Sequence, residues 1–166
     1  MTFLQLFSQN ILYSVVYSLI ISLSFLGLGR LNPEIWLNDY PPDIKARFGP
    51  MSAQTDRQRK MLGVPLILFM LAFPFYVILQ QAKPLTYWEV FGSLLFIYTF
   101  FNLVDLLVLD WLVFNTIQPG FIILPGTEGM AGYKDYGFHF RASIKGQIGM
   151  TVLSLLGAGV LMLFIS

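Results

Sequence analysis

A chain of 166 residues in which 56% are hydrophobic and only 11% are charged is too apolar for an ordinary soluble domain, where about 25% of residues are charged. A net charge of +1, made of charges of both signs, argues against nucleic acid as a partner. Because the chain has no cysteine, disulfides, thiolate metal sites and thiol nucleophiles are excluded.

Four segments are apolar over the roughly 20 residues that a helix needs to cross a bilayer. They are residues 10–29, 61–80, 87–116 and 146–165. The sequence therefore predicts an all-α integral membrane protein, a single membrane domain of residues 1–166 in which four transmembrane helices form a small bundle. The first segment has no Lys or Arg before it and is longer than the apolar part of a signal peptide, so we expect a retained span.

The basic residues are distributed unequally between the connections. All ten Lys and Arg residues except Lys83 fall in or beside the two longer loops, residues 30–60 and 118–145. Lys and Arg next to membrane spans are retained on the cytoplasmic side. We therefore expect both loops to be cytoplasmic and both termini to lie outside, with the plasma (inner) membrane as the location.

Helix caps and prolines set the expected limits of the second and third spans. Ser52 is a candidate cap for a short helix that leads into the second span, and Thr86 with Glu89 fits a capping box before the third. With the second span beginning at residue 61, Pro65 falls in its first turn, where a missing N–H costs little. Pro74 falls in the interior and should kink the helix.

The third span contains the polar residues Asn102, Asp105 and Asp110. A carboxylate near the centre of a membrane helix costs about 2.5–3.5 kcal/mol and calls for a partner or a water-filled cavity. In an α-helix Asn102 and Asp105 share one stripe, whereas Asp110 is rotated by about 140° from Asp105. We therefore expect the two carboxylates on different faces, which argues against a paired acid and base or a two-carboxylate metal site on this helix alone.

The loop of residues 118–145 contains the only histidine of the chain, His139, followed by the cations Arg141 and Lys145. We expect this loop to lie opposite Asp105 and Asp110 and to form a cationic pocket suited to an anionic head group or phosphate. His139 and Asp105 are the candidate catalytic residues, acting as proton donor or acceptor. The candidate substrate-binding residues are Asn102, Asp110, Tyr136, Arg141 and Lys145.

The same residues also have a structural interpretation. Asp105 and Asp110 fit ion pairs that close the bundle, the basic residues fit signals for topology, and His139 fits an interfacial side chain. We predict no cofactor and no metal, because a lone histidine cannot supply both axial ligands of a heme and the glycine turns lack the Lys-Ser or Lys-Thr ending of a phosphate loop.

Three functions are consistent with these features. The preferred one is a polar site at the cytoplasmic boundary that binds an anionic or amphiphilic, lipid-like small molecule, with a lipid-modifying enzyme as its catalytic form. The second is a transporter or channel subunit with Asp105 in the path. The third is an assembly or accessory subunit of a membrane complex, which would contact membrane lipid and a second copy or another membrane protein through the small-residue stripe Ser14, Ser18 and Ser22.

Overall fold

The computed structural model describes residues 3–81 and 85–165, and the regular elements of these ranges are all helical. The α-helices are Phe3–Leu31 (α1), Pro42–Phe48 (α2), Ala53–Leu79 (α3), Tyr87–Val104 (α4) and Tyr136–Ile165 (α5). The 3₁₀ helices are Pro33–Asp39 (η1), Gly120–Ile122 (η3) and Ala131–Lys134 (η4), and Asp105–Ile117 (η2) is a π-helix that continues α4.

Four helices are long and apolar enough to cross a membrane: Ser8–Leu31, Ala53–Leu79, Tyr87–Ile117 and Tyr136–Phe164. The prediction of an all-α chain with four helices of spanning length is confirmed at this level. The expected capping box of Thr86 and Glu89 is present at the start of α4. Lys83, on which part of the topology argument rests, lies outside the described residues.

The second spanning helix begins earlier than its hydropathy predicts. The Ser52 hydroxyl accepts a hydrogen bond from the Thr55 N–H at 3.1 Å, which caps α3 as expected, and the Glu34 carboxylate accepts a hydrogen bond from the Thr55 hydroxyl at 2.6 Å. Because the capped polar turns run without a break into the apolar segment, Pro65 lies inside α3 and not in its first turn. The expected position of Pro65 was wrong for this reason.

The last spanning helix also begins early, at Tyr136. The Asp135 carboxylate accepts the Phe138 N–H at 2.8 Å and so satisfies one of the free donors at the helix start. As a result Tyr136, His139, Arg141 and Lys145 lie on α5, whereas we expected them in a loop. Hydropathy missed these turns because they are too polar to count toward a span.

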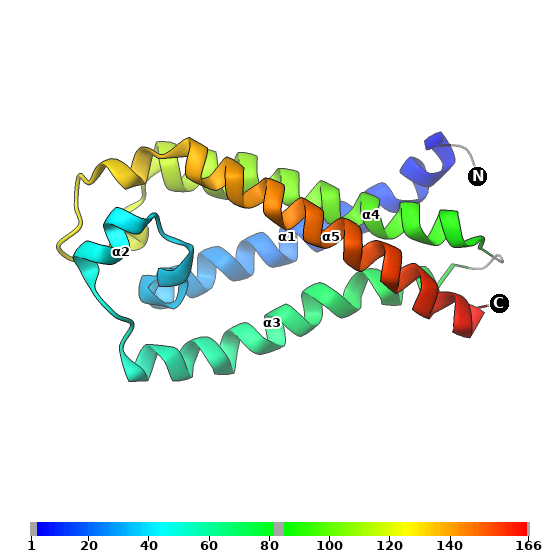
Figure 1. Ribbon diagram of the computed structural model, residues 1–166, viewed down its shortest axis with the longest axis horizontal. Helices are drawn as coiled ribbons and strands as arrows, with labels where there is room; N and C mark the ends of the chain where they lie inside the picture. The colour runs from blue at the N-terminus through cyan, green and yellow to red at the C-terminus, as the bar shows by residue number, and fades with distance from the viewer. Residues whose placement is uncertain (1–2, 82–84, 166) are drawn as a thin grey trace.

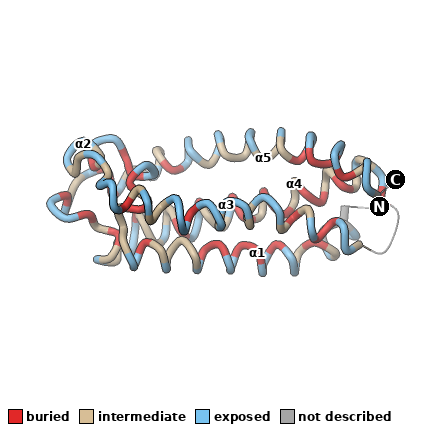
Figure 2. Tube along the Cα trace, turned by 90° about the horizontal axis from the view of Figure 1, so that it is seen from below, coloured by how far each residue is buried: buried red, intermediate tan, exposed pale blue. Residues whose placement is uncertain are grey.

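The two termini of the bundle lie together at one end, and α2 with the longer connections lies at the opposite end (Figure 1). Helix α4 with η2 is the central element: 44% of its most apolar stretch is buried, against 22–28% for the other three spanning helices. Figure 2 shows buried segments concentrated where the helices face one another. The remaining helices present large exposed apolar side chains on their outer faces.

Pro74 links α3 to its neighbours through two tyrosines. Proline has no N–H, so the carbonyl of Met70, four residues earlier, loses its helical donor. The Tyr17 hydroxyl of α1 donates to the Met70 carbonyl at 2.8 Å, and the Tyr98 hydroxyl of α4 donates to the Leu71 carbonyl at 3.2 Å. The carbonyls around the proline are therefore satisfied by two other helices, as an apolar environment requires.

The half of the bundle nearer the termini is filled by a continuous core. Its buried members from α1, α3, α4 and α5 include Tyr17, Ile21, Val77, Leu94, Ile97, Phe101 and Ala158. Ser14, Ser18 and Ser22 of the small-residue stripe face this interior and are buried. The stripe therefore packs helices within one chain.

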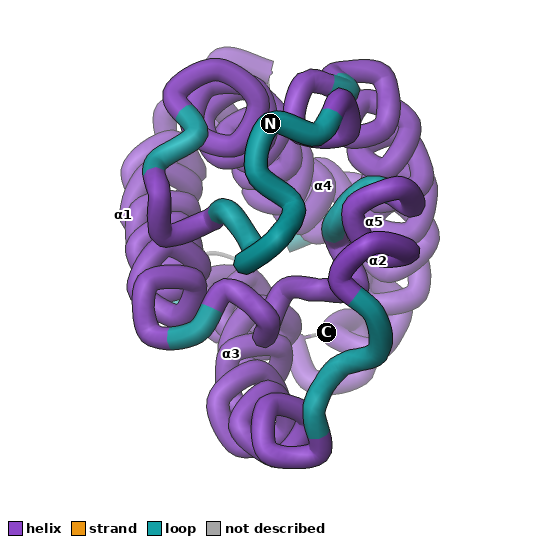
Figure 3. The backbone as a smooth tube through the Cα atoms, turned by 90° about the vertical axis from the view of Figure 1, so that its left-hand side faces the viewer, coloured by secondary structure: helices purple, strands orange, loops and turns teal. Residues whose placement is uncertain are grey.

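The two long connections pack on each other and form a second, smaller core at the opposite end (Figure 3). We call the region of η1, α2, η3 and η4 the loop cap. The Tyr40 hydroxyl donates to the Ile122 carbonyl at 2.6 Å, and the Tyr133 hydroxyl accepts the Leu124 N–H at 2.9 Å. The Asp43 carboxylate accepts the Gly132 N–H at 3.0 Å, so both connections are held in a defined fold.

Candidate functional site

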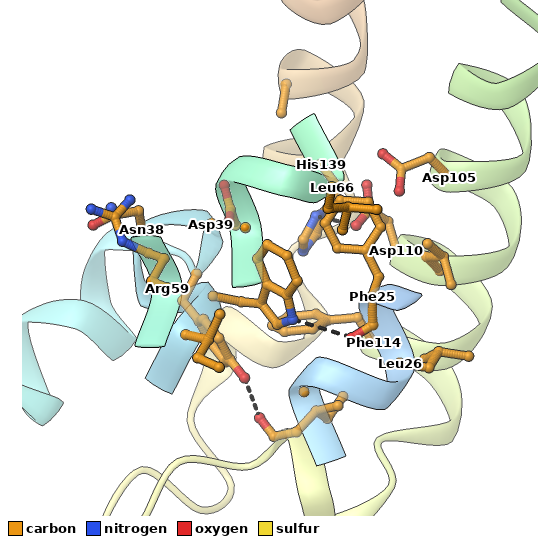
Figure 4. A pocket seen from close by; sticks show the side chains of 18 of the residues that line it. Phe25, Leu26, Asn38, Asp39, Arg59, Leu66, Asp105, Asp110, Phe114 and His139 are labelled. Atoms are coloured by element: carbon orange, nitrogen blue, oxygen red, sulfur yellow. Dashed lines mark hydrogen bonds and ion pairs between the residues drawn. The ribbon is translucent and has the colours of Figure 1, made fainter. Parts of the chain in front are cut away.

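A cavity of about 900 Å³ lies between the loop cap and the helical bundle. Its wall is formed by residues of α1, η1, α3, η2 and α5, so all four spanning helices and the loop cap contribute to it (Figure 4). Much of the wall is apolar and aromatic, and it includes Phe25, Trp36, Leu66, Met70, Val113 and Phe114. Charged side chains of both signs complete the wall.

The His139 imidazole is a buried titratable group of this wall. Its side chain is 6% exposed, and its Nδ1 lies 3.0 Å from Oδ1 of Asp110. The rings of Phe114 and Phe138 lie 4.8 and 5.2 Å from the imidazole, centroid to centroid. Nε2 is buried and has no hydrogen-bond partner among the described residues. When Nδ1 donates its proton to Asp110, Nε2 is left as a proton acceptor.

Asp105 and Asp110 both line this one cavity, so the prediction that they lie on different faces was wrong. The physical reason is the π-helix that begins at Asp105, in which backbone hydrogen bonds join residues five apart. One example is the 2.9 Å hydrogen bond from the Gln118 N–H to the Val113 carbonyl. Such a helix has more residues per turn than an α-helix, so residues five apart come toward the same side. Figure 4 shows Asp105 and Asp110 on the same wall, near His139.

A third carboxylate, Asp39, reaches the cavity from the end of η1. Burial among protein atoms, and next the negative charge of Asp110, raise the pKa of Asp39 above its ordinary value, while Lys45, Arg59 and His139 oppose this effect. Sequence reasoning missed Asp39. Its only signal is a place just before Tyr40 and the Pro41–Pro42 pair, which does not indicate a site.

Four cationic side chains also line the cavity. Arg59 and Lys60 come from α3, and Arg141 and Lys145 from α5. Lys60 is 66% exposed and forms an ion pair with Asp56 at 2.6 Å. Lys145 is exposed and forms no hydrogen bond or ion pair with a described residue. The expected cationic pocket therefore also contains carboxylates, since these four cations and three aspartates line one cavity.

Two predicted substrate-binding residues lie outside the cavity wall. The Asn102 amide joins α4 to α5, where its Nδ2 donates to Gln147 Oε1 at 3.1 Å and to the Ser143 carbonyl at 3.3 Å. Tyr136 packs on Trp111, whose Nε1 donates to the Tyr136 carbonyl at 3.2 Å. Both residues hold α5 against α4–η2 and so position His139.

In residues 3–81 and 85–165 no three His, Asp or Glu side chains lie close enough together to hold a metal ion. The interior beyond Asp105 is filled by the core around Ile97, Tyr98 and Phe101, so the cavity lies at one end of the bundle.

Comparisons with known proteins give no family. No protein-family model, no curated protein and no solved structure matches the chain. The geometry of the cavity is therefore the basis for the function proposed below.

Proposed function

We propose that this protein resides in the plasma (inner) membrane with the loop cap on the cytoplasmic side and both termini outside. The four helices of spanning length and the concentration of Lys and Arg at the loop-cap end support this orientation. Because the chain has no cysteine, single cysteines can test it directly. In intact cells a membrane-impermeant maleimide should label Gln80→Cys, whereas Glu128→Cys in the loop cap should need permeabilised cells; the reverse pattern would overturn the orientation.

We further propose that the cavity binds the polar head group of a membrane amphiphile and that His139 exchanges a proton with it. The observation that carries this proposal is a buried imidazole whose Nδ1 is held by Asp110 while its Nε2 is unpaired, on the wall of a cavity of about 900 Å³. Cavities of about 300–1,000 Å³ with apolar walls and a few polar groups are typical of small-molecule sites. The apolar walls suit a lipid, and the charged groups suit its head.

The roles of the two residues follow from their geometry. Asp110 keeps the proton on Nδ1 and stabilises the imidazolium that forms when Nε2 takes a proton from the bound head group. Asp105, the other candidate catalytic residue, lies on the same wall. His139 is then the candidate proton acceptor, and Asp110 is its positioning residue.

Native mass spectrometry of the protein released from lipid nanodiscs tests the binding proposal. The probe is a nanodisc of an equimolar phospholipid mixture, and the variants are Asp105→Asn and the matched control Glu128→Gln, whose side chain is exposed in the loop cap. We expect the wild type and Glu128→Gln to retain a bound lipid that Asp105→Asn loses. Equal retention in all three forms, as nonspecific lipid gives, would refute a head-group site at this cavity.

A proton-transfer role is tested by the nitrogen NMR signals of the only histidine. With ¹⁵N-labelled histidine, the neutral imidazole of the wild type should be the Nδ1–H tautomer, and Asp110→Asn should shift the equilibrium toward the Nε2–H tautomer. The bound lipid should move the Nε2 signal more than the Nδ1 signal. An Nε2 signal that ignores both the lipid and Asp110 would leave His139 with a structural role only.

The filled core beyond Asp105 favours binding over conduction through a single chain. A path past Asp105 would have to cross the packed side chains of Leu94, Ile97 and Phe101. The transporter hypothesis therefore predicts ion flux in liposomes that Asp105→Asn abolishes, and the binding hypothesis predicts none.

A further inference from the structure

The cavity wall carries charges of both signs, and one of its cations, Arg59, lies near Asp39 (Figure 4). Asp39, Asp105 and Asp110 lie on the wall that surrounds His139, and the carboxylates of Asp39 and Asp105 form no hydrogen bond or ion pair with any described residue. The cations Lys60 of α3 and Lys145 of α5 line the same cavity and are exposed. A ligand that satisfies both sets of charges carries a negative group for the lysines and a positive group for the carboxylates.

Helices α3 and α5 border the side of the cavity that faces away from α1 and α4. They meet near the termini, where a Cβ on Gly157 would lie only 2.5 Å from the Phe75 ring, and they diverge toward the loop cap (Figure 1). In the diverging part the cavity wall includes Ile67 of α3 and Ala142 of α5, which are also exposed on the outer surface. The cavity is thus continuous with the apolar outer surface between these two helices.

We propose that the ligand is a zwitterionic phospholipid with a primary ammonium, which enters from the bilayer between α3 and α5. This proposal rests on the proposed function, and it names the class of head group. The lipid phosphate lies between Lys60 and Lys145, and the ammonium lies among the carboxylates of Asp39, Asp105 and Asp110. The acyl chains leave the cavity beside Ile67 and remain in the membrane.

Three physical arguments favour this occupant. A phosphate between two lysines forms charge-assisted hydrogen bonds, and Lys145 has no other partner among the described residues. A primary ammonium has three N–H donors and can satisfy carboxylates that are otherwise unpaired. An entirely anionic head group, such as phosphoglycerol, would add no positive charge near the carboxylates of Asp39 and Asp105.

The head group also reaches the candidate proton acceptor. In the proposed orientation the ammonium lies beside His139 and donates a hydrogen bond to its unpaired Nε2, the contact along which a proton can exchange. The carboxylates favour the charged ammonium, so the proton stays mainly on the lipid.

The test is competition between two phospholipids that differ only in the head group. Detergent-purified protein is equilibrated with equal amounts of dioleoyl phosphatidylethanolamine and dioleoyl phosphatidylglycerol, and the retained lipid is counted by native mass spectrometry. We expect the wild type to retain the ethanolamine lipid about tenfold more than the glycerol lipid, as one added charge-assisted hydrogen bond would give. The double variant Asp39→Asn/Asp105→Asn should lose this preference, and Lys145→Gln should lower the retention of both lipids.

The outcomes separate this inference from the proposed function. Retention of lipid without a preference, or with a preference for the glycerol lipid, overturns the zwitterionic assignment and leaves a head-group site in place. Retention of neither lipid refutes the proposed function itself. For the route of entry, Ala142→Trp should lower retention at least tenfold, whereas Gly149→Trp, at an exposed α5 position with no atom within 4 Å of its Cβ site, should not. Equal retention in these two variants overturns entry between α3 and α5.

Discussion

The contact between His139 and Asp110 gives the sharpest prediction about stability. Nδ1 and Oδ1 lie 3.0 Å apart, and the side chains are 6% and 23% exposed, respectively. Asp110→Leu removes the acceptor and leaves a buried N–H without a partner. Asp110→Asn keeps an oxygen acceptor at the same place and removes the negative charge. Comparing the two variants separates the contribution of the hydrogen bond to stability from that of the negative charge.

The expected magnitudes follow from burial. An unsatisfied buried N–H costs about 1–3 kcal/mol, so Asp110→Leu should lower the free energy of unfolding by about that amount. Asp110→Asn should cost less than about 1 kcal/mol, because the lost attraction to His139 is offset by lower repulsion from Asp39 and Asp105. His139→Phe removes the donor but keeps a ring against Phe114. The double variant His139→Phe/Asp110→Leu should therefore be more stable than the sum of the single effects predicts.

The assay is reversible unfolding in mixed micelles of a mild detergent and dodecyl sulfate, followed by circular dichroism for the wild type, the three single variants and the double variant. We expect a coupling energy between His139 and Asp110 of about 1–2 kcal/mol, within the range found for residues in direct contact. A coupling energy below about 0.3 kcal/mol would mean that the two side chains do not interact in the folded protein. The account of His139 as an imidazole oriented by Asp110 would then be wrong.

Three further predictions concern other positions. The pKa of Asp39 is raised in the folded protein, so its ionised form destabilises the fold. Asp39→Asn should therefore stabilise the protein against unfolding at about pH 8 but not at about pH 3. A gain in stability that does not change with pH would contradict this prediction. Gly132→Ala places a Cβ against the Asp43 carboxylate and should cost about 1–3 kcal/mol in the same unfolding assay. Gly120→Ala is the control, because a Cβ at that position meets open space. Gly157→Val should destabilise by a similar amount through overlap with Phe75, and Phe75→Leu should restore part of the loss.

The fold was largely predictable because its strongest signals are local. Four apolar segments and the caps at Ser52 and Thr86 were visible in the sequence, and the corresponding helices are present. The helix limits were less predictable. Polar turns such as those after Asp135 extend a helix without adding hydropathy, so α5 begins well before the apolar segment that indicates it.

The site was predictable only in part, because it depends on long-range packing. His139, Arg141 and Lys145 were identified as polar residues beside a span, and they do line the cavity with Asp105 and Asp110. The common side of the two aspartates depends on the π-helix, which no local pattern in the sequence indicates. Asp39 reaches the cavity only because the loop cap folds back on the bundle.

Three carboxylates on one cavity wall destabilise the fold that holds them, since two of them have no partner among the described residues and like charges repel. The second core in the loop cap, with Tyr40 and Tyr133 at its centre, holds η1 in place and so keeps Asp39 near the aspartates of η2. Sites that break the usual rules of charge compensation are typical of functional regions, where a ligand supplies the missing partner. The unpaired carboxylates thus point to a cationic group on the ligand, and the lysines point to an anionic one.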